Sequence, residues 1–267
     1  MERRIHMSNL IIEKLKEKGY YAELTQTSKN GIEQTGIIIG KSHIRGIIYP
    51  DMSLSIDDCV EDIIRTYERT KIPDIDHEIF TWDFAKDNIY LCLQRKTNES
   101  LLKRNFLDLE MYVRVMVEND LSYKVNSKMF GEVSRAEIFL TAEANSKKAL
   151  KVMNMKKMLT ELMHCDEDML PDFEDGNMIV LSNTLGMYGA ASICNMTMLN
   201  DLAIEYNSNL VIIPSSIHEC IVYTDNDPDL KKYAEIITDI NKNVVNPKDV
   251  LNNHAYFYNK ETKKITW

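Results

Sequence analysis

A block of five residues that ends at Glu219 combines the side-chain types used in nucleophilic catalysis. An apolar run ends at Pro214 and the block follows at once, where a predicted strand gives way to a loop. In an acyl-transfer mechanism, Ser215 or Ser216 would be the nucleophile and His218 the base. The chain lacks the G-x-S-x-G sequence that exposes a strained serine, and a short spacing does not by itself aim a hydroxyl at the imidazole.

Two other interpretations compete with catalysis at this block. As metal ligands, His218 and Glu219 would point to opposite faces of a strand, because successive side chains alternate. As a turn, the serine hydroxyls would bond backbone groups and His218 would anchor the loop. We favour the turn, because a motif without known geometry is only a hypothesis.

A second candidate is the acidic segment at residues 165–176, which contains no basic residue. Such a segment could hold a cation, present a partner surface that mimics nucleic-acid phosphates, or form a solvated connector. Calcium loops need ligands at fixed alternating positions around a glycine, and this segment lacks that spacing. We favour the connector and keep a partner surface as the alternative, with the acids Asp166, Glu167, Asp168, Asp172, Glu174 and Asp175.

Methionines are frequent just before the acidic segment, in a chain that contains 15 of them. Methionine-rich faces adapt to different partners, although core packing is the commoner explanation. We therefore add Met153 and Met158 to the candidate partner surface. The lysines between Lys147 and Lys157 are interpreted as a solvated face, since no arginine or aromatic residue among them supports base stacking.

Composition argues against several classes of protein. The 41 acidic and 32 basic residues give a net charge of −9, whereas nucleic-acid binders carry a basic surplus, so we do not expect nucleic acid as a partner.

The five cysteines are widely spaced without a C-x-x-C pair, which indicates reduced thiols. The chain contains no glycine-rich phosphate-binding loop, so we predict no cofactor. No apolar run approaches the roughly 20 residues of a membrane span, and no signal peptide is recognisable, so we predict a cytoplasmic protein without membrane contact.

Helices and strands are predicted in an order typical of α+β proteins. Ser8 is a predicted helix N-cap, Gly19 a left-handed helix end, and Asn30-Gly31 a strong hairpin signal. Further strands are predicted at 88–93, 107–117, 178–182, 190–194, 210–214 and 219–224, and a hairpin at 254–267. Further helices are predicted from the cap at Ser55, as two helices within 134–163, at 196–206, at 228–241 with Asp227 as the cap, and as a short helix at Asn246-Pro247.

The predicted fold is α+β, with mixed or mainly antiparallel sheets and helices packed on one face. A length of 267 residues allows one large domain or two small ones. We place a soft boundary within residues 165–177, between an N-terminal α+β region (1–164) and a C-terminal α+β region (178–267). The absence of a Gly/Ser linker is compatible with one core shared by both regions.

Several segments resemble one bacterial family. They include Lys29-Asn30-Gly31-Ile32, Asn98 to Leu102, Ala142 to Asn145, Met178 to Asn183, Tyr188-Gly189-Ala190-Ala191, Val211 to Glu219 with its Pro-Ser-Ser-Ile-His-Glu sequence, and Val250-Leu251. Together they cover nearly the whole chain and are similar to the domain-of-unknown-function family 5688 (DUF5688). The resemblance implies one fold and implies no activity.

Two functions from different classes remain. The first is a non-catalytic interaction or regulatory protein with a protein partner, for example an accessory or inhibitor in a bacterial conflict system. The second is a hydrolase-like enzyme centred on Ser215, Ser216, His218 and Glu219. The enzyme requires the imidazole to lie within hydrogen-bond reach of a serine hydroxyl or a carboxylate in a concave pocket.

Overall fold

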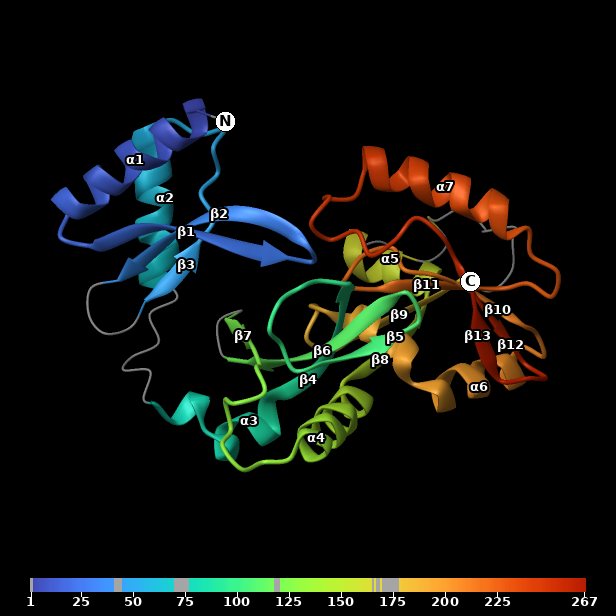
Figure 1. Ribbon diagram of the computed structural model, residues 1–267. Helices are drawn as coiled ribbons and strands as arrows, with labels where there is room; N and C mark the ends of the chain where they lie inside the picture. The colour runs from blue at the N-terminus through green and yellow to red at the C-terminus, as the bar shows by residue number, and fades with distance from the viewer. Residues whose placement is uncertain are drawn as a thin grey trace.

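The computed structural model describes residues 2–40, 45–69, 77–117, 121–164, 166, 169 and 178–267. These residues form an N-terminal module (residues 2–69) and a main body (residues 77–267), as Figure 1 shows. Each strand pairing found among them is antiparallel, which confirms an α+β fold with mainly antiparallel sheets. None of the helices in these ranges is long and apolar enough to cross a membrane.

The N-terminal module is a three-stranded sheet with two helices packed against it. Ile11 and Leu15 lie four residues apart on the first helix, so they share one face and pack with Ile37, Ile39 and Ile63 in a separate apolar cluster. The elements of the module are α1 (Glu2–Glu17), β1 (Tyr21–Lys29), β2 (Ile32–Gly40), β3 (Gly46–Ile48) and α2 (Ile56–Arg69), with the strands in the order β1-β2-β3.

The main body begins with a four-stranded sheet. Its strands β4, β6 and β5 are neighbours in that order, and β7 also pairs with β6. One face of this sheet is covered by α4, which contacts β4. The elements of this part are η1 (His77–Phe80), α3 (Trp82–Asn88), β4 (Ile89–Arg95), β5 (Lys103–Phe106), β6 (Leu109–Met116), β7 (Ser122–Lys124) and α4 (Arg135–Lys148).

A six-stranded sheet in the order β13-β12-β10-β11-β9-β8 completes the main body. Because side chains alternate along β10, Val211 packs under α7 while Ile212 packs with α6 on the other face. The elements are β8 (Leu150–Asn154), α5 (Met155–Met163), β9 (Ile179–Asn183), η3 (Gly189–Cys194), α6 (Met196–Glu205), β10 (Leu210–Ile213), β11 (Cys220–Thr224), α7 (Leu230–Asn243), β12 (Tyr256–Asn259) and β13 (Lys264–Thr266).

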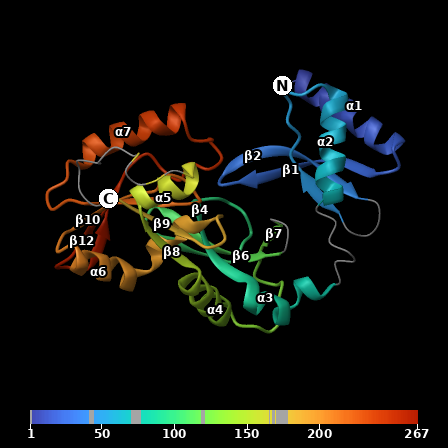
Figure 2. The same cartoon turned by 180° about the vertical axis from the view of Figure 1, so that it is seen from behind.

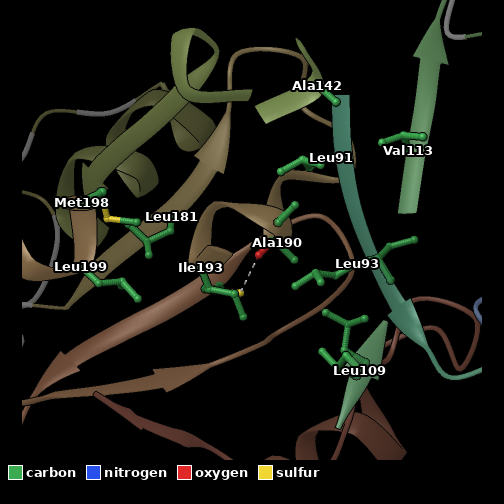
Figure 3. Packing of buried hydrophobic residues seen from close by; sticks show 14 of the residues in the cluster. Leu91, Leu93, Leu109, Val113, Ala142, Leu181, Ala190, Ile193, Met198 and Leu199 are labelled. Atoms are coloured by element: carbon green, nitrogen blue, oxygen red, sulfur yellow. Dashed lines mark hydrogen bonds between the residues drawn. The ribbon is translucent and has the colours of Figure 1, made fainter. Parts of the chain in front are cut away.

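A single apolar cluster joins the two sheets of the main body. Leu93 and Val113 of the four-stranded sheet meet Leu181 of the six-stranded sheet across Ala190 and Ile193 of η3, as Figure 3 shows. The cluster contains residues from Ala85 to Tyr258, and β8 pairs with β9. The segments before and after residues 165–177 therefore share both a sheet and a core.

The ends of two helices differ from the prediction. Helix α1 begins at Glu2, so Ser8 lies inside the helix with only 4% of its surface exposed and does not cap it. Helix α7 is capped by Asp229, whose carboxylate accepts hydrogen bonds from the backbone N–H groups of Lys231 and Lys232. Asp227 therefore lies outside the cap, because an N-cap side chain must reach the free N–H groups two or three residues later.

Three other predicted elements are also wrong. The small residues at 189–194 form the 3-10 helix η3, packed close against neighbouring backbone, rather than a strand. The edge strand β8 was predicted as helix, because its lysine and methionine content favours helix and only pairing with β9 makes it a strand. The predicted helix at Asn246-Pro247 is a turn, in which the Asn246 side chain accepts from the Lys248 N–H.

Candidate functional site

The five-residue block lies in the connection between the antiparallel strands β10 and β11. Ser215 Oγ donates to the Glu219 carbonyl at 3.2 Å, and Ser216 Oγ accepts from the His218 N–H at 3.0 Å. The Ser216 N–H also donates to the Glu219 carbonyl. The loop is therefore closed by its own hydroxyls and backbone groups.

Both ring nitrogens of His218 face groups other than the two serine hydroxyls. Its Nδ1 accepts a hydrogen bond from the Tyr188 N–H at 3.3 Å, so in the neutral ring the proton is assigned to Nε2. Nε2 faces Asp249 Oδ1 at 3.7 Å, which is too long for a hydrogen bond. Within the described ranges no hydrogen bond joins the imidazole to the hydroxyl of Ser215 or Ser216.

The protonation of His218 is set by its partly buried position. Burial lowers the pKa of His218 below its usual value, and the Lys29 ammonium lowers it further. The carboxylates of Asp249 and Glu219 oppose this shift without cancelling it. At neutral pH the ring is therefore mainly uncharged, and it serves Tyr188 as an acceptor.

A close approach of two chain segments holds this loop. A Cβ atom at Gly189 would lie 2.5 Å from Ser182 Oγ and 2.6 Å from the His218 carbonyl, so only glycine fits there. Ser182 Oγ donates to that same carbonyl at 3.0 Å, and the Ala190 N–H donates to the Ile217 carbonyl. Two of the segments that carry the family resemblance are thus in direct contact.

The loop also faces the N-terminal module. Lys29, at the end of β1, forms an ion pair of 2.8 Å with Asp249 Oδ1, while the Ile217 N–H donates to the Asp249 carbonyl. No described group is aligned to donate a hydrogen bond to this buried Oδ1, so the contact with Lys29 is ionic. Asp249 therefore connects the loop, His218 and the hairpin.

The tip of the β1–β2 hairpin reaches the main body, as the views in Figure 1 and Figure 2 both show. Asn30 and Gly31 have φ angles of 53° and 76°, which form the tight turn that the sequence predicts. The Asn30 side chain is only 3% exposed; it donates to the Val250 carbonyl at 2.6 Å and accepts from the Arg95 N–H at 2.8 Å. The guanidinium of Arg95 donates to the carbonyls of Val250 and Pro247.

We call this set of contacts the hairpin clasp, defined by Lys29, Asn30, Arg95, His218, Asp249 and Val250. The sequence alone places none of Lys29, Asn30, Arg95 and Asp249 in a site, although Asn30 is part of the predicted hairpin turn. A signal was nevertheless present, because Lys29-Asn30-Gly31 and Val250-Leu251 both belong to the segments that resemble the family. Nothing in the chain order indicates that residues about 220 positions apart would meet, as Asn30 and Val250 do.

A second polar cluster lies on the four-stranded sheet, beside the clasp. Glu110 is only 4% exposed; it accepts from Gln94 and Thr97 and forms an ion pair with Lys103 at 3.0 Å. Burial raises the pKa of Glu110, but these hydrogen bonds more than offset that effect and lower it overall. Glu110 is therefore a fully bonded structural carboxylate.

The residues of the predicted partner surface are only partly described. Met153 and Met158 are half-buried, at β8 and α5 respectively, and Asp166 is exposed. Close to them in sequence, Met163 and Met169 are exposed by 60% and 74%. The remaining acids, Glu167, Asp168, Asp172, Glu174 and Asp175, lie outside the described residues.

The arrangement at residues 215–219 suits binding and positioning better than covalent chemistry. Each serine hydroxyl is bonded to backbone, Ser215 Oγ also lies 3.5 Å from the Glu219 carboxylate, and the imidazole serves as an acceptor for backbone. Among the residues with described positions, no group of three or more His, Cys, Asp or Glu side chains could hold a metal ion.

Comparison with known proteins places the chain in a family without assigning an activity. The model of one protein family matches residues 5–260, nearly the whole chain, and its description is a family of unknown function (DUF5688). No curated protein and no solved structure matches the chain. With a family model that covers almost all of its residues, the chain belongs to DUF5688.

Proposed function

We propose that this protein is a non-catalytic interaction protein, in which the Ser215–Glu219 loop has a structural task. The observation that carries the proposal is the bonding of this loop, where the side chains of Ser215, Ser216 and His218 all bond backbone groups. A serine nucleophile needs its hydroxyl bonded to a base. Here neither hydroxyl is bonded to the imidazole of His218, and Ser215 Oγ lies closer to the Glu219 carbonyl, at 3.2 Å, than to the Glu219 carboxylate, at 3.5 Å. The loop instead positions Asp249 and the hairpin clasp.

The partner surface that we propose is the acidic segment together with the methionines next to it. The segment carries six carboxylates and no base at residues 165–176, so a partner with a basic face fits its charge. Met163 and Met169 would supply adaptable apolar contacts beside these charges. The narrower role in a bacterial conflict system stays a prediction.

A fluorophosphonate probe tests the non-catalytic part of the proposal, because it labels activated serines. We expect no labelling of Ser215 or Ser216 in the folded protein. The hydrolase-like alternative would be favoured if one serine is labelled and the label is lost on two changes. The first is the alanine variant of that same serine, S215A or S216A, and the second is H218A. Circular dichroism of each variant shows whether the fold is retained.

Charge neutralisation tests the partner surface. In the test variant, all six acids of the segment are changed to Asn or Gln; the matched control neutralises six exposed glutamates elsewhere: Glu13, Glu17, Glu61, Glu132, Glu205 and Glu235. We expect a basic protein to be retained from a native lysate by the wild type and the control, to be lost with the test variant, and to dissociate as salt rises. An unchanged partner profile in the test variant would count against this surface.

A further inference from the structure

An open cleft of about 500 Å³ lies beside the hairpin clasp, between the β1–β2 hairpin and the loop that follows β4. Ser28 and Glu33 line it from the hairpin, and Lys96 and Asn98 line it from the loop. This volume falls within the range of about 300–1,000 Å³ that is typical of small-molecule sites. A ligand in the cleft would contact the N-terminal module and the main body at the same time.

One lining residue of the cleft is held by an ion pair. Glu99 lines the cleft and is held by the Lys124 ammonium, which lies 2.7 Å and 2.8 Å from its two carboxylate oxygens. The same ammonium donates to the Ser28 carbonyl at 3.2 Å and so ties Glu99 to the hairpin. Burial lowers the pKa of Lys124, although the neighbouring Glu99 opposes that shift. Glu99 is therefore already neutralised and is not free to bind a cation alone.

Two charges at the rim of the cleft are not used within the protein. Glu33 and Lys96 are exposed, and in the described part of the chain neither takes part in an ion pair or a side-chain hydrogen bond. The cleft thus presents one free carboxylate from the hairpin and one free ammonium from the loop. Asn98 adds an amide that can both donate and accept.

We propose that the cleft binds a small zwitterion of the amino-acid class, with its ammonium group at Glu33 and its carboxylate at Lys96. A polyphosphate would meet the free carboxylate of Glu33, and a diamine would meet the free ammonium of Lys96, so like charges oppose both. The ligand bridges the hairpin and the loop, and it therefore stabilises the docked position of the N-terminal module.

Calorimetric titration of the full chain with free amino acids and with glycylglycine tests this proposal. We expect at least one of these probes to bind. Amide exchange measured with and without that probe should then be slower at residues 28–33 and 96–99 when it is bound. Putrescine, glutarate, inorganic phosphate and calcium chloride serve as charge controls and are expected not to bind there. If no amino acid and no glycylglycine binds, or if a charge control protects the cleft in their place, the proposal is overturned.

Two surface variants locate the site. Glu33→Gln and Lys96→Gln each remove one charge from the rim, and we expect each to weaken binding by about tenfold or more, the usual loss for a charge-assisted hydrogen bond. The matched controls Glu132→Gln and Lys128→Gln change exposed residues outside the cleft and should bind as the wild type does. Equal affinity in the wild type and both cleft variants would place the ligand elsewhere and refute the assignment.

Discussion

In the main body, segments from Ala85 to Tyr258 meet through one apolar cluster, whereas the N-terminal module meets the main body at the polar hairpin clasp. Within the described residues, the apolar cluster of the module contains no residue of the main body. Burial of apolar surface is strong and non-directional, while hydrogen bonds add little net energy but demand a fixed geometry. The main effect of the clasp is therefore to fix the position of the N-terminal module, and its contribution to the stability of that position is smaller.

The two regions also differ in what they require of the sequence. The cluster tolerates many apolar side chains of suitable volume. The clasp depends on single groups, because the Asn30 amide serves a carbonyl and an N–H at once and no apolar residue can replace it. The following predictions test this contrast, from the largest effect to the smallest.

Leu181→Ala should destabilise the main body strongly. Leu181 is fully buried in β9 at the centre of the cluster, so the variant loses apolar burial and leaves a cavity, at a cost of about 2–5 kcal/mol. Urea unfolding followed by amide exchange measures the loss. We expect protection in β4, β6 and β9 to fall while protection in α1 and α2 stays; an equal loss in α1 and α2 would show that the two cores unfold as one.

Asn30→Ala should detach the hairpin tip without unfolding either core. The change leaves the Arg95 N–H without its partner, at a cost of about 1–3 kcal/mol, and removes one of the two donors to the Val250 carbonyl, which keeps its bond from the Arg95 guanidinium. We expect faster amide exchange at residues 28–34 and 247–251. The control Gln26→Ala removes an exposed side chain of the same hairpin and should leave those rates unchanged.

Acidification should weaken the clasp through His218. Its pKa is lowered in the folded protein, so between the usual value and the folded value the unfolded chain binds more protons. Stability from this group is therefore complete above pH of about 6.5 and declines as the pH falls through the folded pKa. The free energy of unfolding can be measured from pH 8 to pH 5, which is about the range over which histidine titrates. It should decline less in His218→Gln than in the wild type. His6→Gln, at an exposed position, should keep the wild-type decline.

Lys29→Gln should have the smallest effect. The ion pair with Asp249 is partly exposed, with 36% of the lysine side chain accessible, and such pairs contribute about 1 kcal/mol or less. We expect the difference in unfolding free energy from the wild type to shrink in high salt, which screens the charges. A difference that is independent of salt would mean that the lysine acts by packing rather than by charge.

The sequence predicts the local features of the fold well. Asn30-Gly31 forms the predicted hairpin, Gly19 has the predicted left-handed φ of 82°, and the Ser55 and Asp58 side chains pair at the start of α2. These features depend on residues close together in the chain, so their physics is visible in the sequence. Strand β8 and helix η3 differ from the prediction, because pairing with β9 decides the first and close packing decides the second.

For the candidate site, residue types and their order are enough to identify the groups that could do chemistry, the distribution of charge and the family that the chain resembles. The groups that Ser215, Ser216 and His218 bond, and the contacts of Asp249 with Lys29 and of Asn30 with Val250, follow from the folded arrangement of distant segments. The reason is geometric: a hydrogen bond needs two groups within about 3.5 Å and correctly aligned, and the approach of segments over 200 residues apart follows from the packing of whole sheets.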